Sequence, residues 1–176
     1  MSIVTVVGNP RSGSRTYQAA VQATQTIARR IGHEGPSEII DLSALAPLLF
    51  APEASSAVEV ALELVTQAGV LVVASPTYKG TYTGLLKTFL DRLPGGALAS
   101  TVALPLLVMG DARHALAVEV HFRPLLVELG ATVPTPGLAL LESELRETSD
   151  LDVVLDRWAG RVGPQVVAAL REGAAV

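Results

Sequence analysis

Two uninterrupted apolar runs constrain the fold of this chain more than any other feature. They occupy residues 3–7 and 69–74, and each leads directly into a loop rich in Gly, Pro and Ser. Apolar runs without alternation are typical of strands that are covered on both faces, as in the middle of a parallel sheet. With 49% hydrophobic residues in 176, the chain can bury such a sheet.

Weaker patterns complete an alternating order of strands and helices. Three further runs have strand character, at 38–42, 102–108 and 131–133. Pro105 predicts an irregularity inside the second of these. Apolar residues recur at helical spacing over 14–31, 58–65, 85–93, 115–129 and 151–170. We therefore expect one α/β domain over residues 1–176, a flavodoxin-like, doubly wound, five-stranded parallel sheet with helices on both faces.

Composition excludes several classes of function. There is no Cys, and the three His lack metal-ligand spacing, so we expect no disulfide, no Cys nucleophile and no metal. A net charge of −4 and 4% aromatic residues argue against nucleic-acid binding. We find no basic leader and no apolar stretch of the roughly 20 residues that a bilayer requires, so we expect a cytoplasmic protein without a membrane partner.

The first strand leads into a loop, residues 8–16, with the groups that bind phosphate. Its glycines allow tight turns, its hydroxyls donate, and Arg11 and Arg15 supply charged donors. The helix that follows points its first N–H groups at the same place. Two interpretations stay open for the loop alone, a phosphate site or a simple helix cap.

The loop after the third strand, residues 74–84, suits a flat ligand. Pro76, Gly80 and Gly84 favour an extended turn that exposes backbone amides, and Tyr78 offers contact surface. Both loops follow strands, so we expect them at the same edge of the sheet. A Pro/Ser/Ala-rich stretch at 46–56 is a candidate lid beside that edge.

Three segments together resemble a known family. They are Gly-Asn-Pro-Arg-x-x-Ser-Arg at 8–15, Ser-Pro-Thr-Tyr-Lys-Gly-x-Tyr-Thr-Gly-x-Leu-Lys-Thr-Phe-Leu-Asp at 75–91, and Met-Gly-x-x-x-His at 109–114. In this order and spacing they resemble the NAD(P)H-dependent FMN reductases, most closely the alkanesulfonate and methanesulfonate type that feeds reduced flavin to a partner monooxygenase. The resemblance implies FMN and NAD(P)H as cofactors. Since these cofactors carry the hydride transfer, no catalytic side chain is obligatory.

The resemblance also implies which residues hold the flavin. The phosphate loop of the family corresponds to Arg11, Ser14, Arg15 and Thr16. The loop that contacts the isoalloxazine ring corresponds to Pro76, Thr77, Tyr78 and Lys79, with Gly110 and Asp111 at the far side of the ring. Asn9 stands where many relatives have Ser, and its amide still offers a donor. His114 is either a contact to nicotinamide, flavin or a neighbouring subunit, or a plain surface residue.

Pro124 lies inside the helix expected at 115–129 and predicts a simple kink or a π-bulge around 119–123. The resemblance favours the bulge, because sulfonate-type relatives carry one in an interface helix. Leu116 and Val120 give this helix a second apolar face, and we expect Leu86 and Leu90 to do the same on the preceding helix. These faces predict a homodimer or homotetramer.

Three functions remain open at this point. The leading one is a flavin reductase that supplies reduced FMN to a monooxygenase. The second is a quinone or azo reductase with tightly bound FMN, and the third is a flavodoxin-type electron carrier without enzymatic activity. The sequence does not distinguish NADPH from NADH.

Overall fold

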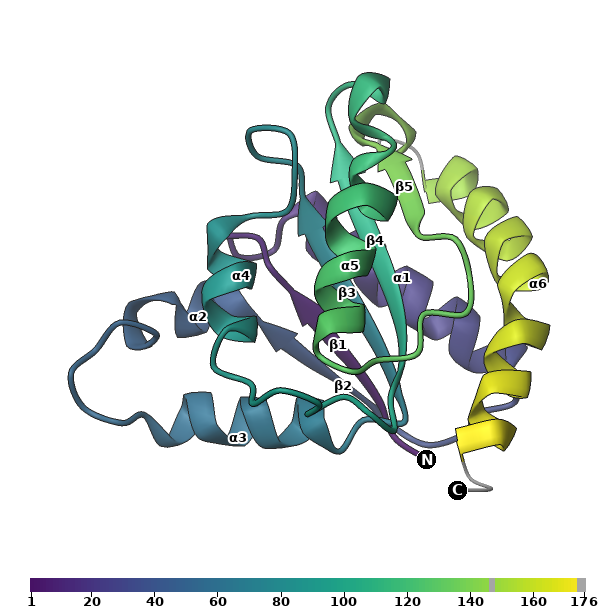
Figure 1. Cartoon of the computed structure of the whole chain (residues 1–176). Helices are drawn as coiled ribbons and strands as arrows, with labels where there is room; N and C mark the ends of the chain where they lie inside the picture. Colours follow the sequence, from purple (N-terminus) through teal and green to yellow (C-terminus); the bar gives the residue numbers. More distant parts are fainter. Residues whose placement is uncertain (146–147, 174–176) are drawn as a thin grey trace.

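A five-stranded parallel sheet organises the molecule, as predicted. The computed structural model describes residues 1–145 and 148–173. The strand order is β2-β1-β3-β4-β5, which is the doubly wound order expected from the sequence (Figure 1). The strands are β1 (Ile3–Val7), β2 (Ser37–Asp41), β3 (Val70–Pro76), β4 (Val102–Met109) and β5 (Leu138–Leu141).

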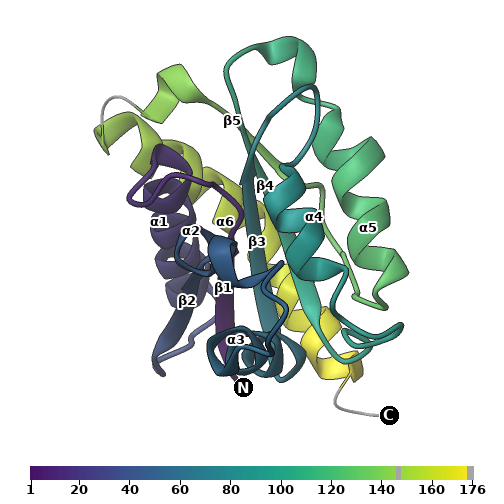
Figure 2. The ribbon, with the colours of Figure 1, turned by 90° about the vertical axis from the view of Figure 1, so that its left-hand side faces the viewer.

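Helices cover both faces of the sheet (Figure 2). One face carries α1 (Arg15–Arg30) and α6 (Thr148–Gly173). The other carries α3 (Ser56–Thr66), α4 (Gly84–Leu90) and α5 (Arg123–Glu128), and the short α2 (Leu42–Leu45) packs beside α4. Side chains cap the two helices that follow the loops singled out above, since Ser14 accepts from the amide of Tyr17 and Thr83 from that of Leu86. No helix in the described part of the chain is long and apolar enough to cross a membrane.

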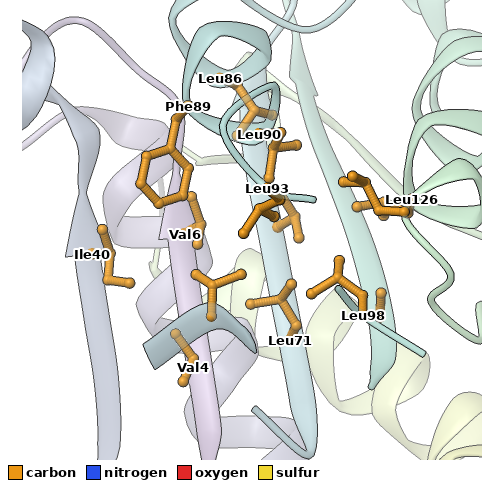
Figure 3. Close-up of a cluster of buried hydrophobic side chains, with 14 of the residues drawn as sticks. Val4, Val6, Ile40, Leu71, Leu86, Phe89, Leu90, Leu93, Leu98 and Leu126 are labelled. Atoms are coloured by element: carbon orange, nitrogen blue, oxygen red, sulfur yellow. The ribbon is translucent and has the colours of Figure 1, made fainter. Parts of the chain in front are cut away.

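Leu86 and Leu90 are fully buried, so our prediction of an exposed apolar face on α4 is wrong. Both belong to the core cluster beneath this helix (Figure 3). Leu86 also lies against the start of the loop after β1, where a Cβ on Gly8 would sit 2.6 Å from the Leu86 Cβ. The helix is short, and the sheet, this loop and α2 cover the side that carries Leu86 and Leu90.

Pro105 does not interrupt β4, contrary to our expectation. The strand runs unbroken, with Pro105 in register with Val73 of β3. The amide of Ala103 donates to the carbonyl of Thr132 on the opposite side, and alternation along a strand directs position 105 to that side as well. Pairing with β5 begins only at Leu106. The missing N–H of Pro105 thus falls in the gap before β5, where no ladder bond is lost.

The fifth strand lies at 138–141 and not at 131–133, so that prediction is corrected. Thr132 forms a single bridge to Val102, and the chain then leaves the sheet. Pro134 and Pro136 follow, and neither can donate to a ladder. Pairing resumes after Gly137, where Leu138 meets Leu106. The apolar run at 131–133 is only the approach to the strand.

A π-helix, Val118–Phe122, precedes α5, so of the two irregularities expected around 119–123 the structure has the π-bulge that the resemblance favours. Its Glu119 and the following Arg123 form an ion pair with a separation of 2.7 Å. Arg123 donates to the carbonyls of Val133, at 2.6 Å, and Thr135, and Glu119 accepts from the amide of Gly137 at 2.5 Å. The wide turn therefore fixes the irregular segment that leads into β5.

Candidate functional site

The loops after β1, β3, β4 and β5 meet at the carboxyl edge of the sheet and enclose a cleft of about 490 Å³. This volume is within the range of small-molecule sites. Of the residues predicted for the site, the cleft brings together Asn9, Arg11, Ser14, Arg15, Thr16, Pro76, Thr77, Tyr78 and Gly110. Ser12, Val108, Met109 and Glu142 complete its lining. The candidate lid at 46–56 contributes nothing to this lining.

The loop after β1 is held by its own side chains. The Asn9 amide donates to the Thr16 hydroxyl, and its oxygen accepts from the amide of Arg11. The loop is tied to the loop after β3, because the Thr83 hydroxyl donates to the carbonyl of Gly8. Gly13 turns the chain with a φ of 61°, a left-handed conformation that favours glycine. Asn9 and Thr16 thus shape the cradle from within.

Exposed donors surround this cradle. Arg11 and Arg15 both line the cleft, together with the hydroxyls of Ser12 and Ser14. The first turn of α1 contains no acidic residue, so the helix itself supplies no charge that would neutralise the positive end of its dipole. Guanidinium, hydroxyl and helix amide donors around one concave surface suit a phosphate group. The donor set therefore fits the phosphate of a flavin mononucleotide.

The loop after β3 presents Tyr78 beside this cradle. The Tyr78 hydroxyl accepts from Arg11 at 3.3 Å, which links the two loops. Backbone bonds in both directions between Tyr78 and Thr81 close a tight turn, with positive φ at Lys79 (54°) and Gly80 (89°). Thr77 donates to the carbonyl of Val108 through its amide and its hydroxyl, so the loop is fastened to β4.

Three predicted residues lie outside the cleft lining. The turn directs Lys79 into solvent. Asp111 caps a short 3₁₀ turn, Ala112–His114, and bonds with the side chain and backbone amide of Arg113 lower the pKa of its carboxyl to about 2. His114 is half-buried at the end of that turn. The structure thus gives Asp111 a capping role, and neither Lys79 nor His114 contacts the cleft.

Gly110 borders the cleft on the β4 side. A Cβ built there would meet no atom within 4 Å, and its backbone has no positive φ. Glycine is therefore not required at this position by the protein itself. The open space belongs to the cleft, which agrees with a flat ring passing close to the backbone.

Glu142 is the residue that the sequence did not indicate. It follows β5 directly, and its carboxylate lies 2.9 Å from the guanidinium of Arg15. Both side chains are about half exposed. Because the fifth strand was expected at 131–133, the end of the strand, and with it Glu142, could not be located from the sequence. A correct position for β5 would have revealed it.

Comparisons with known proteins agree with this geometry. The family model described as NADPH-dependent FMN reductase matches residues 1–144. An FMN reductase (NADPH) of Escherichia coli strain K12 is 38% identical over 147 residues, which cover 82% of this chain and 75% of the relative. The NADH-dependent FMN reductase SfnE of Pseudomonas putida is 32% identical over 151 residues, covering 84% and 80%. The apo structure of the NADH:FMN oxidoreductase EMOB superposes with a TM-score of 0.81 at 32% identity, covering 93% and 88%.

Proposed function

Because the chain belongs to the NADPH-dependent FMN reductase family, we propose that it reduces FMN in the cleft at the sheet edge and releases the product to a partner monooxygenase. Membership makes it an oxidoreductase that uses FMN with NADPH or NADH. The observation that carries the site assignment is the convergence of two arginines, two hydroxyls and a helix N-terminus beside Tyr78. Supply to a monooxygenase is what the resemblance to the sulfonate-type reductases implies, and release of the flavin is supported by the exposure of Arg11, Arg15 and Tyr78 at the cleft.

The residues of the cleft bind and orient. When bound, FMN accepts a hydride from the nicotinamide, which is chemistry that the flavin supplies itself. Arg11, Arg15, Ser12 and Ser14 would hold the phosphate of FMN, and Gly110 and Tyr78 would border its ring. Orientation is the protein's contribution, because hydride transfer needs stacked rings at short distance more than it needs an acid or a base.

Steady-state assays test the activity. Oxidation of NADPH and of NADH is followed with FMN, FAD and riboflavin as acceptors, and flavin release is followed by dialysis. We expect FMN to be the preferred acceptor and the flavin to exchange freely. Flavin that stays with the protein through dialysis while a quinone or azo dye is reduced would instead indicate the quinone or azo reductase. Flavin binding without nicotinamide oxidation would indicate a carrier.

Gly110→Val tests the position of the ring. A Cβ at this position meets no atom within 4 Å, so the fold is expected to persist. The valine side chain would occupy the path of the ring, and flavin affinity and turnover should both fall at least tenfold. Full affinity in this variant would place the ring elsewhere.

We also propose that residues 1–176 act as one cytoplasmic reductase domain and assemble as a homodimer or homotetramer. Support for assembly comes from the segment around the π-helix, where Leu116, Val120 and Val127 are 71%, 57% and 54% exposed. A second copy of the chain would cover this surface. Sedimentation of the wild type should show a dimer or tetramer, and Val120→Asp should shift it toward smaller species. A wild type that sediments as a fully active monomer would contradict the proposal.

A further inference from the structure

The cleft contains one carboxylate among its phosphate-binding groups. Among the lining residues, all within the described part of the chain, Glu142 alone is acidic. Its Oε1 lies 2.9 Å from an Nη of Arg15. The position is fixed by the turn after β5, where the Glu144 carboxylate accepts from the amide of Leu141 at 2.6 Å. Glu142 therefore competes directly with an incoming phosphate for Arg15.

The effect of Glu142 extends to the second arginine. The hydrogen bond with Tyr78 raises the pKa of Arg11 most, and the negative charge of Glu142 raises it further. A carboxylate that stabilises both guanidinium charges also reduces the positive potential that both present to a ligand. Glu142 therefore contacts Arg15 directly and acts on Arg11 more weakly, through its charge.

Counting charges shows the consequence for a phosphate. Arg11 and Arg15 together carry two positive charges, which would match a phosphate monoester of about −1.5 to −2. The negative charge of Glu142 cancels one of these two positive charges, so part of the negative charge of a bound phosphate is left uncompensated. Its own pair with Arg15 is about half exposed, and such ion pairs open at little cost. The cradle can thus accept a phosphate and can also reform its internal pair when the phosphate leaves.

We propose that Glu142 is a specificity-determining residue that weakens the grip of the cleft on the phosphate, so that the flavin stays an exchangeable substrate. This role rests on the function proposed above, and it makes Glu142 the residue that sets how readily the flavin exchanges. It predicts that the natural site binds FMN less tightly than its two arginines allow. The effect depends on the phosphate, and riboflavin, which has none, is not affected.

Binding measurements test this without turnover. Dissociation constants of FMN and riboflavin are measured by quenching of flavin fluorescence for the wild type, Glu142→Gln, Glu142→Asp and Glu34→Gln. Glu34 is an exposed carboxylate before β2, at the opposite end of the sheet, so its variant matches the change in net charge. We expect Glu142→Gln to bind FMN about three- to tenfold more tightly, from one like charge removed near the surface. Riboflavin affinity should stay within about twofold.

The controls separate this effect from a structural one. Glu142→Asp keeps the charge and should stay near the wild type, as should Glu34→Gln. The gain in Glu142→Gln should disappear in 1 M salt, where charges are screened within about 3 Å. FMN release measured by stopped flow should slow by the same factor as the affinity gain, because such changes act mainly on dissociation.

The outcomes are distinct. A wild type that does not bind FMN refutes the proposed function itself. A wild type that binds FMN, with Glu142→Gln unchanged or weaker, refutes the role of Glu142 alone, and weaker binding would mean that the carboxylate orients Arg15 for the phosphate. Equal gains for FMN and riboflavin would also overturn the proposal, since the phosphate would then play no part.

Discussion

Two arginine–glutamate pairs in this molecule have the same chemistry and opposite environments. Arg15 and Glu142 meet across the cleft with side chains 50% and 51% exposed, whereas Arg123 and Glu119 meet beside the π-helix at 27% and 34%. The first pair joins two loops at an open edge. The second lies against the segment 133–137, and both of its members also bond to backbone groups there.

The difference lies in how completely each pair is satisfied. Two further N–H groups of Arg123 donate to carbonyls, and Glu119 accepts from a backbone amide as well as from Arg123. Each of the three guanidinium nitrogens of Arg123 therefore already has a partner within the protein. Within residues 1–145 and 148–173, the contact recorded for the Arg15 side chain is the one with Glu142, so most of its donors remain for another acceptor. A charged pair with most of its donors unused at an open edge is suited to binding, and a pair that is also bonded to a backbone segment stabilises the fold.

The largest expected effect is on stability, from Arg123→Ala. The change removes two bonds to backbone carbonyls and leaves Glu119 without its cation, so we expect a loss of about 2–4 kcal/mol in the free energy of unfolding. Urea denaturation followed by circular dichroism measures it. Arg157→Ala, an exposed arginine on α6, is the matched control and should stay within about 0.5 kcal/mol. Equal losses in the two variants would remove the distinction between the pairs.

The second largest expected effect is a loss of FMN affinity in the double variant Arg11→Ala, Arg15→Ala. The two charged donors contribute about 1.5–3 kcal/mol each without full additivity, so FMN affinity should fall by about 2–3 kcal/mol. Flavin fluorescence quenching measures it. The free energy of unfolding should hardly change, because both side chains are exposed. Unchanged FMN affinity would show that the phosphate lies elsewhere.

Lys79→Gly is the matched control for that experiment. The resemblance to the family places Lys79 at the ring, but the turn directs it away from the cleft lining, so we expect a loss in FMN affinity below about 0.5 kcal/mol. Glycine also suits the φ of 54° at this position, so the turn should be kept. A loss as large as that of the arginine pair would mean that the loop moves toward the flavin on binding.

The sequence was sufficient to predict the structure of those segments whose local pattern agrees with their burial in the fold. The apolar runs of β1 and β3 lie at the centre of the sheet as predicted, and the helix expected from Ser14 begins there. Pro124 indicated that the helix around it is irregular, because a missing N–H forces the preceding turn to change, and the family resemblance favoured a π-bulge over a simple kink. The loops that follow these elements supplied most of the cleft lining.

Sequence reasoning failed where the outcome depends on contacts between distant segments. The position of β5 depends on Arg123 and Glu119 holding the segment 133–137 out of the sheet, ten or more residues away. Once β5 was misplaced, Glu142 could not be assigned to the cleft. The exposure of α4 was also misjudged, since periodicity shows that Leu86 and Leu90 are apolar but not that other elements enclose the helix.

The smallest expected effect is on the pH dependence of the free energy of unfolding, and the variant Glu119→Gln tests it. Partial burial raises the pKa of Glu119, but the bonds from Arg123 and Gly137 outweigh it and hold the pKa below its ordinary value of 4.5. A carboxyl whose pKa is lowered by folding stabilises the fold at every pH above its pKa in the unfolded chain. This contribution is lost as the pH falls through the pKa that the carboxyl has in the folded protein. Since the side chain is about a third exposed, we expect Glu119→Gln to cost only about 1 kcal/mol at pH 7. Denaturation curves at pH 7 and at pH 3 should show the gap between wild type and variant narrowing toward acid. A gap of constant size would mean that the carboxylate charge contributes nothing, and that the segment 133–137 is held by Arg123 alone.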